Sequence, residues 1–174
     1  HSFFKGQVYL PHIVDEVMWS HPQTTFTWVC SKKDHNEALS MFDPKLHSRI
    51  RMLDWMSQGE LRDVYDTHGI FLFPTLAEGA GKSCLEAMSR GMCVVASDNS
   101  GMKDYINSGQ NGLLAPVGDA SAFARGTARF LSQTELARRC SVQAVRFGQS
   151  RSWKRTAKGI EEFYQTLLER QKRH

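Results

Sequence analysis

The sequence lacks several features that would assign it at once to a common class of protein. No run of apolar residues approaches the 18 or so that would predict a membrane-spanning helix. The first ten residues, HSFFKGQVYL, have no charged segment followed by an apolar one, so they do not predict a signal peptide. The chain has 174 residues, 41% of them hydrophobic, which is enough to bury a core. We therefore expect one globular domain over residues 1–174.

Cysteine and histidine occur without the spacing of a metal site or of a disulfide framework. Cys30, Cys84, Cys93 and Cys140 form no zinc-ligand pattern. The seven histidines are scattered and include no H-x-x-x-H pair. We expect the cysteines to be reduced and to act as small apolar residues, which favours a cytoplasmic protein. No metal ion or other cofactor is expected.

The net charge is +4, and the basic excess lies late in the chain. Aromatic residues do not alternate with these charges, as a surface that stacks nucleic-acid bases would require, so nucleic acid is not an expected partner. A solvated helix face accounts for the charges more simply than attraction to an anionic membrane surface, which stays open as an alternative. The residues concerned are Arg138, Arg139, Arg146, Arg151, Lys154, Arg155, Lys158, Arg170, Lys172 and Arg173.

Short apolar runs predict strands at residues 24–30, 50–53, 70–73, 93–97 and 112–116. The runs at 70–73 and 93–97 are apolar throughout, which indicates burial on both faces, as in a parallel sheet covered by helices. Strands and helices alternate up to residue 131, so the fold class is α/β, a Rossmann-like doubly wound parallel sheet with extra C-terminal helices. Helices are expected at 7–19, after Ser57-x-x-Glu60, from Ser83-x-x-Glu86 to Gly91, at 120–131 after Asp119, at 133–147 after Ser132-x-x-Glu135, and after Ser152.

The stretch EGAGKSCLE, residues 78–86, contains the Gly-Lys-Ser ending of a phosphate-binding P-loop. The P-loop pattern requires a glycine at position 76, where this chain has Leu76. Glu78 would also place a negative charge inside a cradle for polyphosphate. A P-loop-type ATPase therefore remains only an alternative.

A second interpretation fits the same stretch better. Gly79 and Gly81 allow the backbone to approach a ligand closely, and the amides near residues 82–83 begin a helix, where phosphate is favoured. Glu86, one turn into that helix, can accept hydrogen bonds from two ribose hydroxyls, and Glu78 can reach a group beyond the phosphates. These features predict a site for a nucleoside diphosphate with a substituent.

The segment FLFPTLAEGAGKSCLEAMSRGMCVVASDNSG, residues 71–101, resembles the donor-binding segment of family 4 retaining glycosyltransferases of the GT-B fold. The resemblance extends over essentially the whole chain: Lys5-Gly6, LDWM at 53–56, NGLL at 111–114 and SWKRTA at 152–157 also match family motifs. It implies that the chain is the C-terminal, nucleotide-sugar-binding half of such an enzyme. The N-terminal acceptor domain would be absent from the chain. So would the first strand, on which the family has an arginine.

The resemblance also implies roles for individual residues. Glu78 would contact the donor sugar and stabilise developing charge, and Lys5 would neutralise the departing diphosphate. Glu86 would hold the ribose, and Met56 would lie near the base. The sugar and diphosphate would be bound by Gly79, Ala80, Gly81, Lys82 and Ser83.

The implied activity is transfer of a glycosyl group from a UDP-, GDP- or ADP-sugar to an acceptor hydroxyl, with retention of configuration and without a metal. Such an enzyme would act in polysaccharide or glycolipid biosynthesis, in the cytoplasm or associated with a membrane. A non-catalytic nucleotide-binding module is the alternative from another functional class. The donor sugar and its base stay open.

Overall fold

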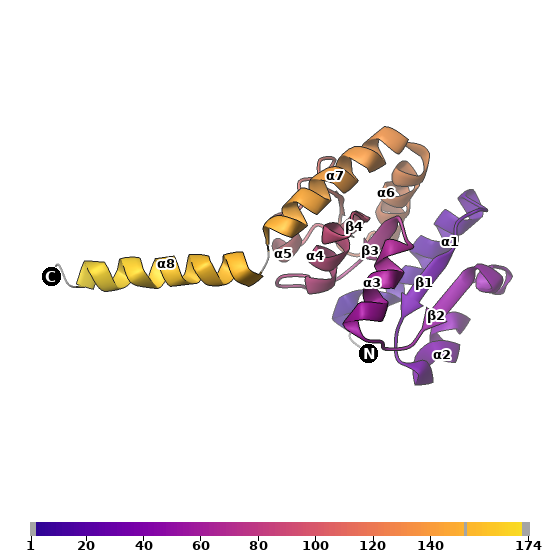
Figure 1. The fold of residues 1–174 in the computed structure, drawn as a ribbon. Coiled ribbons are helices and arrows are strands. Elements are labelled where there is room, and N and C mark those ends of the chain that lie inside the picture. Colours follow the sequence, from indigo (N-terminus) through magenta and orange to yellow (C-terminus); the bar gives the residue numbers. More distant parts are fainter. Residues whose placement is uncertain (1–2, 152, 172–174) are drawn as a thin grey trace.

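The computed structural model describes residues 3–151 and 153–171, whose arrangement is shown in Figure 1. The predicted strands are confirmed, and three of them have the predicted limits. The strands are β1 (Phe26–Val29), β2 (Ile50–Leu53), β3 (Ile70–Phe73), β4 (Cys93–Ser97) and β5 (Leu113–Ala115).

The α-helices follow the predicted order, with α2 and α5 as short additions. They are α1 (Leu10–Ser20), α2 (His35–Ser40), α3 (Gln58–Asp66), α4 (Lys82–Ser89), α5 (Ser100–Lys103), α6 (Ala120–Ser132), α7 (Thr134–Ser150) and α8 (Trp153–Gln171). Short 3-10 turns lie at Phe3–Lys5, Gln7–Tyr9, Lys32–Asp34 and Pro44–Arg49.

Two of the predicted helix starts are confirmed by their hydrogen bonds. The Ser57 amide donates to the Glu60 carboxylate at 2.8 Å, and the Glu60 amide donates back to Ser57 Oγ at 3.3 Å, which completes a capping box. The Asp119 carboxylate accepts from the amide of Ala122 at 2.8 Å and caps α6.

The other two predicted capping boxes are wrong. Helix α4 begins at Lys82 after Gly81, so Ser83 already lies inside the first turn and cannot be the cap. Ser132 is the last residue of α6, where its hydroxyl donates to the carbonyl of Ala128 at 2.7 Å. The following helix, α7, starts after Gln133 instead. At both positions the Ser-x-x-Glu pattern is present, but the helix begins at a neighbouring residue.

All strand pairs are parallel, and β4 is covered on both faces, as its apolar sequence predicted. Val94 and Ala96 pack into a cluster with α3, α4, α5 and α7. Cys93 and Val95 pack on the opposite face, in a cluster with α1, α6 and α7. Helices on both faces of a parallel sheet confirm the doubly wound α/β class.

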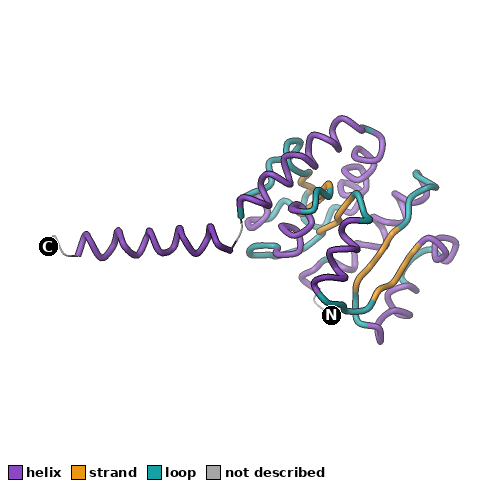
Figure 2. Tube along the Cα trace, in the orientation of Figure 1, coloured by secondary structure: helices purple, strands orange, loops and turns teal. Residues whose placement is uncertain are grey.

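The strands divide into two sheets, which the sequence did not predict. One has the order β1-β2 and the other the order β3-β4-β5 (orange in Figure 2). Helix α1 packs against α6 and contributes Ile13 to the core of the larger sheet and Val14 to the core beside β2. The two sheets are thus joined by helix packing on one face and not by strand pairing.

Helix α8 extends away from the other elements (Figures 1 and 2). None of its residues is buried, and its apolar stripe, which includes Trp153, Ile160 and Tyr164, is exposed. Ser152, predicted to precede this helix, lies outside the described residues, as do Lys172 and Arg173. Within the described ranges, no helix combines the length and the apolar character that crossing a membrane requires.

Candidate functional site

Most of the predicted site residues lie on loops that follow the carboxyl ends of strands or on the helix α4 that follows one of these loops. Residues 74–81 connect β3 to α4, and residues 54–57 connect β2 to α3. Ligands of open α/β sheets bind outside these ends of the strands. Because they follow the carboxyl ends of β3 and β2, Glu78, Lys82 and Met56 lie on the edge of the fold where such ligands bind.

Lys5 and Glu78, which are 73 positions apart in the sequence, form an ion pair in which Lys5 Nζ donates to Glu78 Oε2. Gly6 makes this approach possible. It has φ +68°, and a Cβ on it would lie 1.7 Å from the carbonyl oxygen of Pro74. The N-terminal turn therefore packs directly on the end of β3, where only glycine fits. The aromatic ring of Phe73 lies 5.8 Å below the Lys5 ammonium.

The environment of Glu78 favours its ionised form. The hydrogen bond from Lys5 lowers the pKa of the Glu78 carboxyl below its usual value, against the opposing effect of partial burial. The charge of Lys5 and the backbone amides of Gly81 and Gly79 lower the pKa further. Only 17% of the Glu78 side chain is exposed, against 56% of Lys5, so the ion pair has a sheltered anion and a solvated cation.

A hollow of about 530 Å³ lies beside this ion pair. It is lined by both charged residues and by further residues of the loop after β3, so it combines a cation and an anion. Its lining residues are Phe4, Lys5, Leu76, Ala77, Glu78, Gly79 and Asn99.

Asn99 holds the loop in place, a role that the sequence analysis missed. Its Nδ2 donates to the carbonyl oxygen of Thr75 at 3.2 Å and to Thr75 Oγ1 at 3.1 Å. Thr75 is only 1% exposed and Asn99 is half-buried, so these bonds form a partly buried tether between the loops after β3 and β4. The signal in the sequence that could have identified Asn99 is its position as a polar residue shortly after the buried strand at 93–97.

Gly81 shapes the start of α4. Its backbone is left-handed, with φ 58° and ψ 57°. A Cβ there would lie 2.6 Å from Met102 Cε and 2.8 Å from Tyr105 Oη. No side chain caps α4, so its first amides are available to an anion, with Lys82 exposed beside them.

Glu86 lies in the second turn of α4, and its neighbour is Tyr65 of α3. Tyr65 Oη donates to Glu86 Oε2 at 3.5 Å, a long hydrogen bond. Burial raises the pKa of Tyr65, and the Glu86 charge adds to the shift. Since the predicted capping box with Ser83 does not form, Glu86 has no role in starting the helix.

The remaining predicted site residues lie around the Lys5–Glu78 ion pair and the start of α4. Ser83 lines a second, larger cavity that lies between β1 and β3. Met56 is partly exposed on the loop after β2 and lines neither cavity. Ala80 is exposed at the tip of the loop. Asp98, which directly follows β4, pairs with Lys103 at 3.3 Å.

Comparison with known proteins identifies relatives of this chain. A family model described as "Glycosyl transferases group 1" matches residues 2–133. The amylovoran biosynthesis glycosyltransferase AmsK of Erwinia amylovora is 33% identical over 132 residues, which cover 68% of this chain and 32% of AmsK. The D-inositol 3-phosphate glycosyltransferase of Nocardia farcinica is 27% identical over 123 residues, covering 71% of this chain and 27% of that protein.

Solved structures share the fold. The sucrose-phosphate synthase of Thermosynechococcus elongatus aligns with a TM-score of 0.82 at 21% identity, over 96% of this chain and 43% of that one. Anabaena HepE, crystallised with UDP and glucose, aligns with a TM-score of 0.78 at 20% identity, over 97% of this chain and 46% of HepE. The chain spans about a quarter to a third of the length of AmsK and of the Nocardia farcinica glycosyltransferase.

Proposed function

Because this chain belongs to the glycosyl transferases group 1 family, we propose that it is the donor-binding domain of a family 4 retaining glycosyltransferase of the GT-B fold. It binds a nucleoside diphosphate sugar and positions the sugar for transfer to an acceptor hydroxyl. An acceptor domain elsewhere in a longer polypeptide completes the enzyme. The family match favours this function over a P-loop-type ATPase.

The contact between Lys5 and Glu78 is the observation that carries the proposal. The ion pair lies beside a polar hollow, close in sequence to the uncapped start of α4. A bound diphosphate attracts the Lys5 ammonium, and Glu78 then turns its charge toward the donor sugar. Positive charge develops on that sugar in an oxocarbenium-like transition state, where a fixed carboxylate stabilises it.

Helix α4 binds the nucleotide in this proposal. The amides of Ala80 and Lys82 and the Ser83 hydroxyl bind the diphosphate, as helix N-termini commonly do, while the Gly79 and Gly81 amides hold Glu78. Glu86, one turn further, accepts hydrogen bonds from the ribose hydroxyls. Met56, on the neighbouring loop, borders the base. The diphosphate leaves against Lys5 and the α4 amides, so the chemistry that we propose requires no metal.

Thermal stability in the presence of UDP, GDP or ADP tests the proposal directly. UDP is the first to measure, because HepE was crystallised with UDP and with UDP-glucose. At 100 times its dissociation constant the correct nucleotide adds about 2.7 kcal/mol to stability, which raises Tm by about 5–10 °C for a chain of this size. The Glu86→Gln variant is the control, and its Tm should rise less at the same concentration.

Three outcomes would count against the proposal. If none of the three nucleotides raised the Tm, the chain would have no donor site. Stabilisation by ATP only with Mg²⁺ would support the P-loop ATPase. Measurable sugar transfer to an acceptor by the 174-residue chain alone would show that it is not merely the donor half, because we expect binding without transfer.

A further inference from the structure

Helix α5 packs so closely on the loop that carries Glu78 that one of its residues has to be a glycine. A Cβ on Gly101 would lie 2.1 Å from the carbonyl oxygen of Gly79 and 2.4 Å from that of Glu78. Both neighbours are backbone atoms, which cannot turn aside as the end of a flexible side chain can. Gly101 is not among the glycines with a positive φ, and glycine is a poor helix former, so the backbone of α5 gives no reason for it. The small size of Gly101 therefore serves the contact with the loop.

The same short helix and its cap also contact the beginning and the end of the loop. Asn99 precedes α5, accepts a hydrogen bond from the Met102 amide at 3.4 Å, and donates to Thr75 at the beginning of the loop. At the end of the loop, a Cβ on Gly81 would lie 2.6 Å from Met102 Cε. Thr75 and Met102 are buried, so these contacts can move little. Together with the contact at residues 78–79, they make α5 a rigid support for the whole loop.

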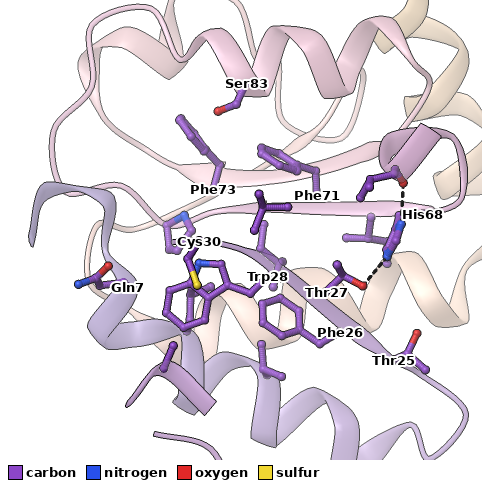
Figure 3. A pocket seen from close by; sticks show the side chains of 18 of the residues that line it. Gln7, Thr25, Phe26, Thr27, Trp28, Cys30, His68, Phe71, Phe73 and Ser83 are labelled. Carbon is purple, nitrogen blue, oxygen red and sulfur yellow. Dashed lines mark hydrogen bonds between the residues drawn. The ribbon is translucent and has the colours of Figure 1, made fainter. Parts of the chain in front are cut away.

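Lys5, the partner of Glu78, is held by β3 and the residues that follow it. Gly6 packs on the backbone just after β3, and the Lys5 ammonium lies 5.8 Å from the centre of the Phe73 ring. Figure 3 shows this ring projecting from β3 toward the side on which Ser83 of α4 lies. A shift of the Glu78 loop away from α5 would therefore change the distance between the two charged groups.

The ionised state of Glu78 depends on the loop backbone as well as on Lys5. The hydrogen bond from Lys5 is the largest cause of the lowered pKa of the Glu78 carboxyl, and the amides of Gly81 and Gly79 lower that pKa further. Hydrogen bonds weaken steeply when donor and acceptor move apart or out of line. A displaced loop would leave the carboxylate less well paired and its pKa closer to that of an ordinary glutamate.

We propose that Gly101 is a positioning residue for Glu78. Because it has no side chain, α5 can close on the backbone of Glu78 and Gly79, and this contact holds the carboxylate against Lys5. When a diphosphate draws Lys5 away, the same contact keeps the carboxylate directed at the donor sugar. This last step rests on the proposed function, whereas the hold on the ligand-free carboxylate does not.

The pKa of the Glu78 carboxyl in the 174-residue chain tests the contact without any ligand. NMR of protein labelled at the glutamate carboxyl carbons follows it, and Glu78→Gln identifies the signal. We expect Gly101→Ala to raise this pKa toward that of an ordinary glutamate, because the added methyl group displaces the loop from its hydrogen bonds. Cys84 and Tyr105 also sense the Glu78 charge, but burial raises the pKa of both, that of Cys84 to about 12, so neither titrates in the acidic range.

Gly148→Ala is the matched control for lost packing. Gly148 lies in α7, also without a positive φ, and a Cβ on it would lie 2.7 Å from the backbone of Ser89 at the end of α4. This variant should lower the Tm as Gly101→Ala does, and it should leave the pKa of Glu78 unchanged. A folded Gly101→Ala variant with a lower Tm and an unchanged Glu78 pKa would overturn the proposal, because Gly101 would then have a structural role only.

Asn99→Ser decides the matter if Gly101→Ala does not fold. A serine can still cap α5, but its shorter side chain does not reach Thr75, so the support loosens without a new clash. The pKa of Glu78 should rise in this variant too, by less than in a folded Gly101→Ala variant. If Gly101→Ala is unfolded and Asn99→Ser leaves the pKa unchanged, the proposal is wrong.

Ligand binding separates this inference from the proposed function. UDP and UDP-glucose are the probes, because HepE was crystallised with each of them. We expect Gly101→Ala to weaken UDP-glucose binding about tenfold and to change UDP binding less than about twofold, since Glu78 contacts the sugar. Equal weakening of both ligands would contradict a role through Glu78. If the unmodified chain bound neither ligand, the proposed function would fail, and the Glu78 pKa alone would decide on Gly101.

Discussion

The loop at residues 74–81 and the helix that follows it, α4, each present one glutamate to the same edge of the fold, but they hold it differently. Glu78 is fixed by charge, through Lys5 from the far N-terminus and through nearby backbone amides. Glu86 is fixed by the helix backbone, and its carboxylate accepts a long hydrogen bond from the Tyr65 hydroxyl. A carboxylate that is already paired with a cation can be released when a ligand competes for that cation. One on a rigid helix offers a constant acceptor.

The largest expected effect is on the free energy of unfolding, and it distinguishes Gly81 from Gly79 in the loop. Gly81→Val forces a β-branched residue into a left-handed backbone against Met102 and Tyr105. It should lower the free energy of unfolding by about 3–5 kcal/mol, the sum of backbone strain and overpacking. Gly79→Ala is the matched control, because nothing lies within 4 Å of its added Cβ. Urea denaturation of both variants measures the difference, and equal losses would mean that the junction of loop and helix is not rigid.

The next effect concerns Glu78 in the two-domain enzyme that we propose. Glu78→Gln should lower turnover about 100-fold, because a carboxylate that stabilises developing charge acts mostly in the transition state. UDP affinity should hold while affinity for the sugar donor falls. Glu135→Gln, which removes an exposed carboxylate paired with Arg138, controls for the lost charge. Tighter UDP binding by Glu78→Gln with unchanged turnover would favour the P-loop interpretation, in which this charge repels polyphosphate.

Glu86 should show a smaller effect, confined to the nucleotide. Glu86→Gln should weaken UDP binding by roughly 1.5–3 kcal/mol, because hydrogen bonds to a charged acceptor are the stronger kind. The Tm of the ligand-free domain should barely move, since Glu86 does not cap α4 and glutamine can still accept from Tyr65. Calorimetric titration together with a thermal melt decides the matter. A lower Tm with unchanged UDP affinity would assign Glu86 a structural role only.

The smallest effect is the contribution of the Lys5–Glu78 ion pair to stability. Lys5 is largely exposed, so Lys5→Met should cost less than about 1 kcal/mol at pH 7. The folded pKa of Glu78 is lowered, so this contribution is present above the unfolded value near 4.3 and disappears as the pH falls through the folded pKa. The two proteins should therefore converge in stability once the pH is below the folded pKa of Glu78. A difference that persists after Glu78 is protonated would trace the effect to packing on Phe73.

Local patterns in the sequence determined most of the elements of this fold. Apolar runs of four or five residues predicted β3 and β4 at their observed limits. The predicted burial on both faces holds for β4, whereas the first three residues of β3 are only partly buried. Ser57 and Asp119 marked helix starts because the side chain of each bonds the amide only three residues further along the chain. The Ser83 pattern failed because Gly81 adopts a left-handed conformation and begins the helix earlier.

Only the tertiary structure decided which distant groups meet. The Lys5–Glu78 contact depends on Gly6 packing against Pro74, and the tether from Asn99 to Thr75 joins loops after different strands. The division of the strands into two sheets likewise depends on which edges pair across the chain. Sequence spacing carries information about neighbours within a turn or a strand. Contacts across tens of residues are selected by the shape and charge of surfaces that exist only once the chain has folded.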